Sequence, residues 1–399
     1  MDNRYRILLI TFFSMFVFGM VLQSIPPVLA RLIVDMNLSH TQGGLLMSLF
    51  ALPGIILSLP GGMLADYYGP RKVGIISLLL MLAGTLIVAS ASTFAMLALG
   101  RFVTGIGATT IVIVSAQALS RGFMNKKLGI AMGVFNAGVP AGTIFAHNFF
   151  SRALIIWDWR MPILFTTLAC LVMLVFFWKF SGFPEPVNNK QEINRSGDGK
   201  SRPTLSILES LQSIRQYRAI WMVATAWMLF IAARVSSLTF APDYFISIGY
   251  QVSYAGFLAS LFTMGSLVIS PLIGHFIDKT GRSESYLVAG GVILAVLYSL
   301  IAVALTGHLL LALFIGIAAA IMPVSIFSLV PRLLPVEKMG MGYGVLRICE
   351  NIGMLMGPFL IGLSFDLSGA YFYGFLLMAF FSLGASVNGL LLKIYQGKG

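Results

Sequence analysis

Long apolar runs, separated by short polar segments, dominate the chain. Twelve of them approach or exceed the roughly 20 residues that an α-helix needs to cross a bilayer. Because these runs are continuously apolar, they differ from the strands of an outer-membrane barrel, which alternate over about ten residues. The pattern predicts an all-α membrane protein with twelve transmembrane helices, near residues 7–29, 43–64, 73–91, 95–119, 129–151, 161–180, 219–240, 252–275, 286–305, 309–331, 341–364 and 371–394.

The composition supports a membrane location for the whole chain. Its 399 residues are 58% hydrophobic and only 10% charged, whereas a soluble protein carries about 25% charged residues. The first apolar run is too long for a signal peptide and lacks a small-residue cleavage site. We therefore expect an integral, multi-pass protein whose surroundings are the lipid bilayer.

The net charge of +12 is distributed unevenly along the chain. Of the 26 lysines and arginines, twenty fall on one side of a twelve-span topology, and Arg31, Arg152 and Arg160 fall on the other. This bias follows the positive-inside rule and places both termini in the cytoplasm. The charge therefore indicates topology, and no nucleic-acid partner is expected. We expect a bacterial inner membrane, with a eukaryotic organelle as the alternative.

One long polar segment, residues 181–218, divides the spans six and six. Its first part is rich in Pro, Asn, Gly and charge, as in a mobile linker. Ser206 and Glu209 then form a capping-box pattern, and apolar residues follow at helical spacing, which predicts a short amphipathic helix on the cytoplasmic surface. The expected organisation is a six-helix bundle at 1–180, this linker, and a second six-helix bundle at 219–399.

The two halves repeat each other. The stretch "GGMLADYYGPRK" after the second span has a partner, "IGHFIDKTGRS", after the eighth. Internal symmetry of this kind is typical of transporters whose solute site lies between the repeats, near mid-membrane. The matched residues are Gly62 and Gly274, Asp66 and Asp278, and Gly69 and Gly281.

The charges of these loops suggest a gate. Asp66 follows the second span, where the helix dipole disfavours an anion, so a partner such as Arg71 is expected. A charge cluster there can latch the halves in one state and release them in another. The alternative is a turn whose charges only fix topology, but the second copy favours the gate. The predicted inner gate comprises Gly62, Asp66, Gly69, Arg71, Asp278, Gly281 and Arg282.

At these residues the chain resembles the major facilitator superfamily. Gly-x-Leu-Ala-Asp-x-x-Gly-x-Arg-Lys matches the signature loop of that family, and the copy after the eighth span is a degenerate version. Arg101 and Gly105 match its Arg-x-x-x-Gly pattern, and "WDWRMP" resembles its entry to the sixth helix. The resemblance implies two six-helix bundles with rocker-switch alternating access. It also implies that Asp66, Gly69 and Arg71 act at the inner gate and that Arg101 belongs to the cavity or gating network.

Four ionisable residues lie well inside the spans: Arg101, Arg234, Arg347 and Glu350. A charge at mid-bilayer costs about 2.5–3.5 kcal/mol on insertion scales, so each should face the bundle interior or a wet cavity. Three arginines against one glutamate favour an anionic or carboxylate-bearing solute. The expected substrate-binding residues are Arg101, Asn136, Arg234, Arg347, Glu350 and Asn351. We interpret His147 as a hydrogen bonder in helix packing.

Arg347 and Glu350 lie three residues apart, on one helical face. Either they neutralise each other and hold the helix in place, or Arg347 binds an anion while Glu350 binds a proton or a substrate amine. Arg234 has no acidic neighbour within its helix. It is therefore either an anion contact or the partner of Glu350 in an ion pair.

The substrate class is narrowed by what the chain lacks. "GVFNAGVPAG" in the fifth span faintly resembles the signature of nitrate and cyanate porters, but the arginines that nitrate porters use in spans two and eight are missing. The drug-antiporter pattern Gly-Pro-x-x-Gly-Gly is not matched there either, and the first span carries no acid, so efflux of cationic drugs is disfavoured.

We therefore expect a secondary active transporter of a small carboxylate-containing solute, coupled to protons through Glu350. One alternative is a dipeptide transporter, since a zwitterion requires both arginine and glutamate. A second is a non-transporting membrane sensor. No nucleophile triad, metal-ligand constellation or phosphate-binding loop appears, so we expect no enzyme activity, no metal and no cofactor. The expected state is a monomer.

Overall fold

The computed structural model describes residues 3–58, 60–123, 128–181, 217–335 and 338–396. This part of the chain is helical and contains no strand. Twelve of its helical segments are long and apolar enough to cross a membrane. The all-α, twelve-span prediction is thereby confirmed. The predicted linker and its amphipathic helix fall almost entirely on residues 182–216, outside the described residues, so the division of the chain there stays a prediction.

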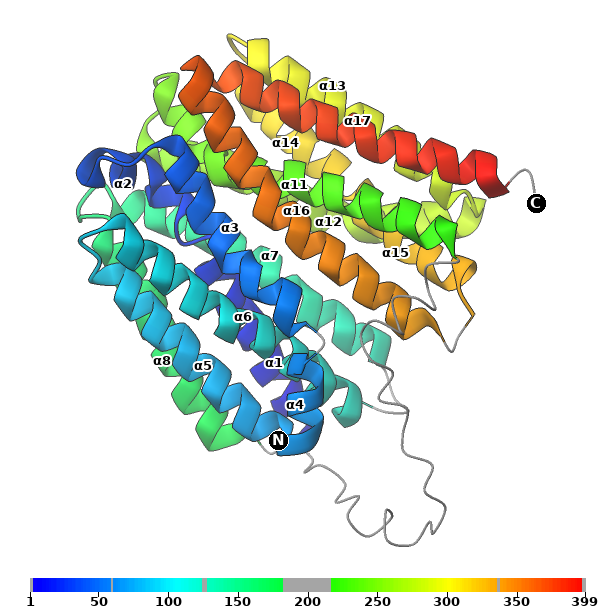
Figure 1. Ribbon diagram of the computed structural model, residues 1–399, viewed down its shortest axis with the longest axis horizontal. Coiled ribbons are helices and arrows are strands. Elements are labelled where there is room, and N and C mark those ends of the chain that lie inside the picture. Colours follow the sequence, from blue (N-terminus) through cyan, green and yellow to red (C-terminus); the bar gives the residue numbers. More distant parts are fainter. Residues whose placement is uncertain (1–2, 59, 124–127, 182–216, 336–337, 397–399) are drawn as a thin grey trace, which may run out of the picture.

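Residues 3–181 are called the N-terminal half below, and residues 217–396 the C-terminal half (Figure 1). The N-terminal half contains α1 (Asn3–Leu22), η1 (Pro26–Val28), α2 (Leu29–Met36), α3 (His40–Leu57), α4 (Pro60–Tyr68), α5 (Pro70–Ala89), α6 (Phe94–Gly122), α7 (Leu128–Ala153) and α8 (Arg160–Phe180). The C-terminal half contains α11 (Arg218–Ser247), α12 (Val252–Thr280), α13 (Ser283–Val303), α14 (His308–Ala319), α15 (Ile321–Leu333), α16 (Met339–Ser368) and α17 (Tyr371–Gln396).

The start of α1 and the end of α17 lie toward the same side of the bundle (Figure 1). We call this side the terminal face; it also carries the connections that follow α4 and α12. The opposite side, the distal face, carries α2 and the connections at residues 37–39, 90–93 and 304–307. Successive spans cross between these two faces.

Prolines interrupt two of the predicted spans. In the run 43–64, α3 ends at Leu57 and α4 begins at Pro60, a residue that suits the first helical position because it has no N–H to leave unpaired. The run 309–331 is split into α14 and α15 around Ala320. Pro323 lacks the N–H that would bond the carbonyl of residue 319. Hydropathy thus located the crossings, and proline chemistry set the breaks within them.

The halves meet closely toward the distal face, where α3 packs antiparallel against α16. A Cβ atom at Gly44 would overlap the carbonyl oxygen of Pro358, and one at Gly362 would overlap that of His40. Between these points the Ser48 hydroxyl donates to the carbonyl of Leu355. Glycines at the crossing therefore allow direct backbone contact between the halves.

Toward the terminal face the same helices separate. A Cβ atom at Gly340 or Gly344 of α16, or at Gly133 of α7, would have no neighbour within 4 Å. The tight glycines and the free ones thus lie at opposite ends of the interface. The conformation is closed on the distal face and open on the terminal face.

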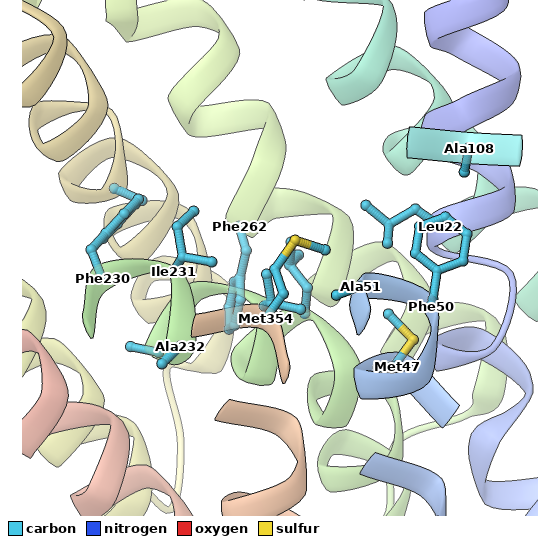
Figure 2. Packing of buried hydrophobic residues seen from close by; sticks show 14 of the residues in the cluster. Leu22, Met47, Phe50, Ala51, Ala108, Phe230, Ile231, Ala232, Phe262 and Met354 are labelled. Atoms are coloured by element: carbon cyan, nitrogen blue, oxygen red, sulfur yellow. The ribbon is translucent and has the colours of Figure 1, made fainter. Parts of the chain in front are cut away.

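Buried hydrophobic side chains of both halves pack into one continuous cluster, and Figure 2 shows a group of them where the halves meet. We call the group that Figure 2 labels the hydrophobic layer. When the two halves come together, this apolar surface is removed from water, which favours the closed distal face. Figure 2 labels its members Leu22, Met47, Phe50, Ala51 and Ala108 from the N-terminal half, and Phe230, Ile231, Ala232, Phe262 and Met354 from the C-terminal half.

Candidate functional site

A cavity lies between the halves, with about 430 Å³ of empty space that includes open solvent at its mouth. Three of its lining residues, Phe50, Ala51 and Met354, also belong to the hydrophobic layer, which therefore forms its floor. Helices α1, α3 and α6 supply one wall and α16 supplies the other. The lining residues are Phe18, Phe50, Ala51, Ser58, Thr109, Val112, Ile113, Arg347, Glu350, Asn351 and Met354. Three of the predicted site residues thus share one cavity.

Arg347 and Glu350 form an ion pair within α16. Nη1 of Arg347 lies 2.8 Å from Oε1 and 2.9 Å from Oε2 of Glu350. The Arg347 side chain is 45% exposed and that of Glu350 is 20% exposed. Asn351 donates from Nδ2 to the carbonyl of Arg347 at 2.9 Å, so it braces the same turn. The cavity wall therefore offers a positive and a negative group side by side.

Arg234 lies one turn beyond Phe230 of the hydrophobic layer, toward the distal face. Its Nη2 donates to the hydroxyl of Thr263 on α12 at 3.3 Å. Its Nη1 is buried and finds no hydrogen-bond partner among the described residues. The ion pair with Glu350 that the sequence left open is not formed, because Glu350 bonds Arg347 instead. A buried guanidinium nitrogen without an acceptor is costly.

A buried polar side chain from the N-terminal half, His147, lies near Arg234. His147 of α7 is fully buried, and neither of its ring nitrogens finds a hydrogen bond within the described residues. The Ser151 hydroxyl, one turn further along α7, is also buried without a hydrogen bond within the described residues. Arg234 is near enough for its charge to act on the His147 imidazole. We call Arg234, Thr263 and His147 the Arg234 site.

The Arg234 site and the cavity lie at different depths. Gly353 of α16 packs on the backbone of Met228 in α11. One turn later Gly357 packs on the backbone of Ala232, so the two helices keep the same register. Arg347 is therefore level with Met222, twelve residues before Arg234. At 1.5 Å per residue the two arginines lie about 18 Å apart along the helices. This figure is the offset between their backbone positions, so the two arginines stand at different levels of the interface.

Arg101 is held within the N-terminal half, with only 1% of its surface exposed. It donates to the carbonyls of Leu46 at 3.0 Å, Val21 at 3.1 Å and Leu22 at 3.3 Å. Two of these carbonyls end α1 and have no partner within that helix. The guanidinium also lies 4.5 Å from the ring centre of Phe50. We therefore assign Arg101 to the packing of this half and not to solute contact.

Asn136 is exposed on α7 and is not among the residues that line the cavity. It lies near Gly133, where the halves are apart. A role for Asn136 as a solute contact from α7 is therefore a proposal for a state in which the terminal face closes.

The first gate loop contacts its own half. Gly69 has a φ of +84°, which glycine adopts readily, and it directly precedes α5. Arg71 donates from Nη2 to the carbonyl of Trp178 at 3.0 Å, near the end of α8. A cation at a helix C-terminus is stabilised by the helix dipole. The structure does not describe the surroundings of the Asp66 side chain or the exposure of Gly62.

The second gate loop behaves in the same way. Gly281, with a φ of +67°, ends α12, and Arg332 donates to its carbonyl at 2.7 Å. Asp278 and Arg282 are both exposed. The hydrogen bonds made at both loops thus stay within the same half as the loop itself, in keeping with an open terminal face. An inner-gate role for these residues remains a proposal.

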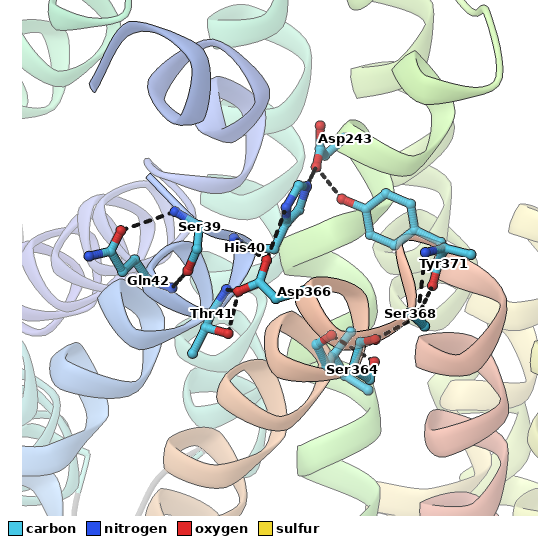
Figure 3. Close-up of polar contacts among 11 residues, drawn as sticks. Ser39, His40, Thr41, Gln42, Asp243, Ser364, Asp366, Ser368 and Tyr371 are labelled. Atoms are coloured by element: carbon cyan, nitrogen blue, oxygen red, sulfur yellow. Dashed lines mark hydrogen bonds and ion pairs between the residues drawn. The ribbon is translucent and has the colours of Figure 1, made fainter. Parts of the chain in front are cut away.

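A polar cluster at the distal face was not among the sequence candidates (Figure 3). The carboxylate of Asp366 accepts the backbone N–H of His40 at 2.9 Å and that of Thr41 at 2.8 Å, and it also accepts the Thr41 hydroxyl. Nε2 of His40 lies 3.1 Å from Oδ2 of Asp243, which also accepts the hydroxyl of Tyr371. We call these five residues the distal cluster.

The sequence carried only a partial signal for this cluster. Ser39 and Gln42 form a capping box that marks the start of α3, and acids lie near the distal ends of two later spans. The pairing itself was not visible, because His40 and Asp366 are 326 positions apart.

Comparisons with known proteins agree with this architecture. A family model described as "Major Facilitator Superfamily" matches residues 7–358 and 239–396. The "Lysosomal dipeptide transporter MFSD1" of Danio rerio is 22% identical over 86% of this chain and 76% of its own. The "Probable nitrate/nitrite antiporter NarK1" of Thermus thermophilus is 26% identical over 80% and 71%. The human "Solute carrier family 2, facilitated glucose transporter member 10" is 26% identical over 70% of this chain, which spans about half (53%) of that protein.

Two solved structures show the same fold. A point mutant of the nucleoside transporter NupG superposes with a TM-score of 0.82 at 13% identity, over 98% of this chain and 100% of its own. A bacterial homologue of the human lysosomal transporter Spinster, in an inward-facing and occupied conformation, gives a TM-score of 0.79 at 16% identity, over 99% and 97%.

Proposed function

Because the chain belongs to the major facilitator superfamily and is a membrane transporter rather than an enzyme, we propose that it moves a small carboxylate-bearing solute by alternating access. The observation that carries the substrate class is the buried, unpartnered Nη1 of Arg234. A carboxylate oxygen is the acceptor that best satisfies a guanidinium, and it also neutralises the charge. His147 supplies a further donor from the opposite half.

The solute meets two positive positions in turn. On the terminal side it enters the open cavity beside Arg347 and Glu350. Beyond the hydrophobic layer it meets the Arg234 site, whose residues come from both halves. Opening of the distal face separates α7 from α12 and exposes that site. The solute thus moves from Arg347 to Arg234, whose backbone positions are offset by about 18 Å along the helices.

Proton coupling is proposed to act through the ion pair in the cavity. A proton on Glu350 removes the negative charge that holds Arg347, so the guanidinium becomes free for the solute carboxylate. Binding of the proton and of the anion then favour each other, and this coupling is reciprocal. The expected result is symport of an anion with a proton.

We further propose that the terminal face is cytoplasmic and that the protein acts as a monomer in a bacterial inner membrane. The support for orientation is the bias of lysine and arginine toward that face. The solute path lies between the two halves of one chain, so a second copy is not needed to complete it.

The test is thermal unfolding of the purified protein with monocarboxylates, dicarboxylates, amino acids, dipeptides and inorganic anions. A ligand at 100 times its Kd stabilises the folded state by about 2.7 kcal/mol. We expect carboxylates to stabilise the wild type and Arg31→Ala, a control at an exposed, distal ion pair. They should not stabilise Arg234→Ala. Stabilisation only by neutral or cationic compounds would overturn the proposed substrate class.

A dipeptide is the second candidate, and one observation favours it. Arg347 and Glu350 present opposite charges on the same cavity wall, as the two ends of a zwitterion require. The MFSD1 relative, itself named a dipeptide transporter, is consistent with this interpretation. Stabilisation by dipeptides alone, lost in both Arg347→Ala and Glu350→Gln, would select this candidate over a simple carboxylate.

A further inference from the structure

The distal cluster places one imidazole between two carboxylates of the opposite half (Figure 3). Nε2 of His40 lies 3.1 Å from Oδ2 of Asp243, and Nδ1 lies 3.6 Å from Oδ1 of Asp366. The three side chains are 18%, 11% and 25% exposed, so water screens them only in part. Nε2 is therefore within hydrogen-bond distance of one carboxylate, and Nδ1 is within ion-pair distance of the other.

The hydrogen-bonding capacity of histidine makes this arrangement depend on protonation. A neutral imidazole has one N–H donor, and its other nitrogen is an acceptor. In the neutral form, one ring nitrogen of His40 would turn a lone pair toward a carboxylate. The protonated ring donates from both nitrogens and carries the charge that both acids attract. A positive imidazole would thus be attracted by both carboxylates in the closed cluster, whereas a neutral one would keep only the hydrogen bond with Asp243.

The other groups around the ring do not replace that proton. Tyr371 of α17 donates its hydroxyl to Asp243 and supplies no charge. The ring of Phe365 in α16 lies 3.7 Å from the imidazole, centre to centre. Elsewhere on the distal face, on α2, Arg31 and Asp35 pair with each other at 2.9 Å. The distal cluster thus contains two carboxylic acids, and His40 is the member that can carry a positive charge.

We propose that His40 is a proton-binding site whose occupation is linked to closure of the distal face. His40 belongs to the N-terminal half, and both acids belong to the C-terminal half, so opening of the distal face must break every one of these contacts. Linkage then requires that protonation favours closure and that closure favours protonation. The proposal rests on the alternating access of the proposed function, and it is independent of the solute and of Glu350.

Asp366 makes a second contribution that needs no proton. Its carboxylate accepts the N–H groups of the first two residues of α3, and the Ser39 hydroxyl accepts that of Gln42 at 3.2 Å. The acid therefore caps a helix N-terminus, where the dipole favours a negative charge. The two contributions are separable: changes at His40 should remove the response to pH, whereas changes at Asp366 should weaken closure at every pH.

Distances between spin labels at Ser92 and Leu305 test this. Both residues are exposed on distal connections, one in each half. The buried Cys170 and Cys349 are replaced by alanine so that only the two introduced cysteines are labelled. Pulsed electron–electron double resonance then gives the populations of short (closed) and long (open) distances at pH 5.5 and pH 8.

We expect the closed-to-open ratio to be about fivefold or more higher at pH 5.5 than at pH 8, which is the lower end of typical coupling between sites. In His40→Gln the ratio should be the same at both pH values. In Asp366→Asn it should fall at both, with a shift between them retained. Thermal unfolding of each variant checks that it is folded.

Two results would overturn the proposal: no change with pH in the wild type, or a full wild-type response in His40→Gln. Neither result affects the proposed substrate class, which ligand stabilisation through Arg234 tests separately. If the protein did not work by alternating access at all, a different measurement would show it. In that case even Gly44→Val, which removes the space for distal closure, would show no long distances.

Discussion

Gly44 of α3 lies directly against the carbonyl oxygen of Pro358 in α16, with no room for a Cβ atom between them. This contact joins the two halves near the distal face. Since interfaces that close by direct backbone contact are not continuously deformable, a single added side chain there should shift the balance between conformations.

We expect Gly44→Val to keep the distal face from closing and to lower transport at least about tenfold. Labels at Ser92 and Leu305 should then show mainly the long distance. Gly344→Val is the matched control: it is the same substitution in a transmembrane helix, at a position where a Cβ meets nothing within 4 Å. If Gly344→Val opened the distal face equally, the close contact at Gly44 would not be the cause.

Arg101→Ala should destabilise the protein without a specific effect on solute affinity. The substitution removes the guanidinium hydrogen bonds to three buried carbonyl groups and opens a cavity beside Phe50, at an expected cost of about 3 kcal/mol or more. Thermal unfolding measures this loss. Arg31→Ala, at an exposed pair, should change stability little. An unchanged melting temperature in Arg101→Ala would contradict the packing role.

The double variant Arg347→Gln/Glu350→Gln separates the two interpretations of the cavity pair. If the residues only neutralise each other, each single variant leaves one unpaired charge, and the neutral pair restores transport. We expect no restoration, because the solute requires the guanidinium itself. The stability difference should be small, since partly exposed pairs three residues apart contribute about 0.2–0.5 kcal/mol. Recovered uptake in the double variant would assign the pair a structural role.

Glu350→Gln alone should uncouple transport from the proton gradient. Without an exchangeable proton at this position, proteoliposomes should exchange solute across the membrane but not accumulate it against a gradient. The measurement is uptake with and without an imposed pH difference. Wild-type uptake that does not change when the proton gradient collapses would refute the coupling.

The sequence could not predict that Arg101 and Arg234 differ in role. Both are arginines within apolar spans, and the cost of burial predicts only that each faces the protein interior or water. Arg101 meets the carbonyls that end α1, whereas Nη1 of Arg234 meets no acceptor in the described part of the chain. The difference depends on where neighbouring helices end and how they are offset.

The sequence by itself determined the twelve crossings and the ionisable residues within them, because the bilayer penalises each polar group locally, whatever its distant neighbours are. Only the tertiary structure decided which residues meet: the cap that Asp366 places on α3, the pairing of His40 with Asp243, and the depth that separates Arg234 from Arg347. Such contacts depend on the register between helices hundreds of residues apart. Close glycine contacts set that register in three dimensions, and no local pattern records it.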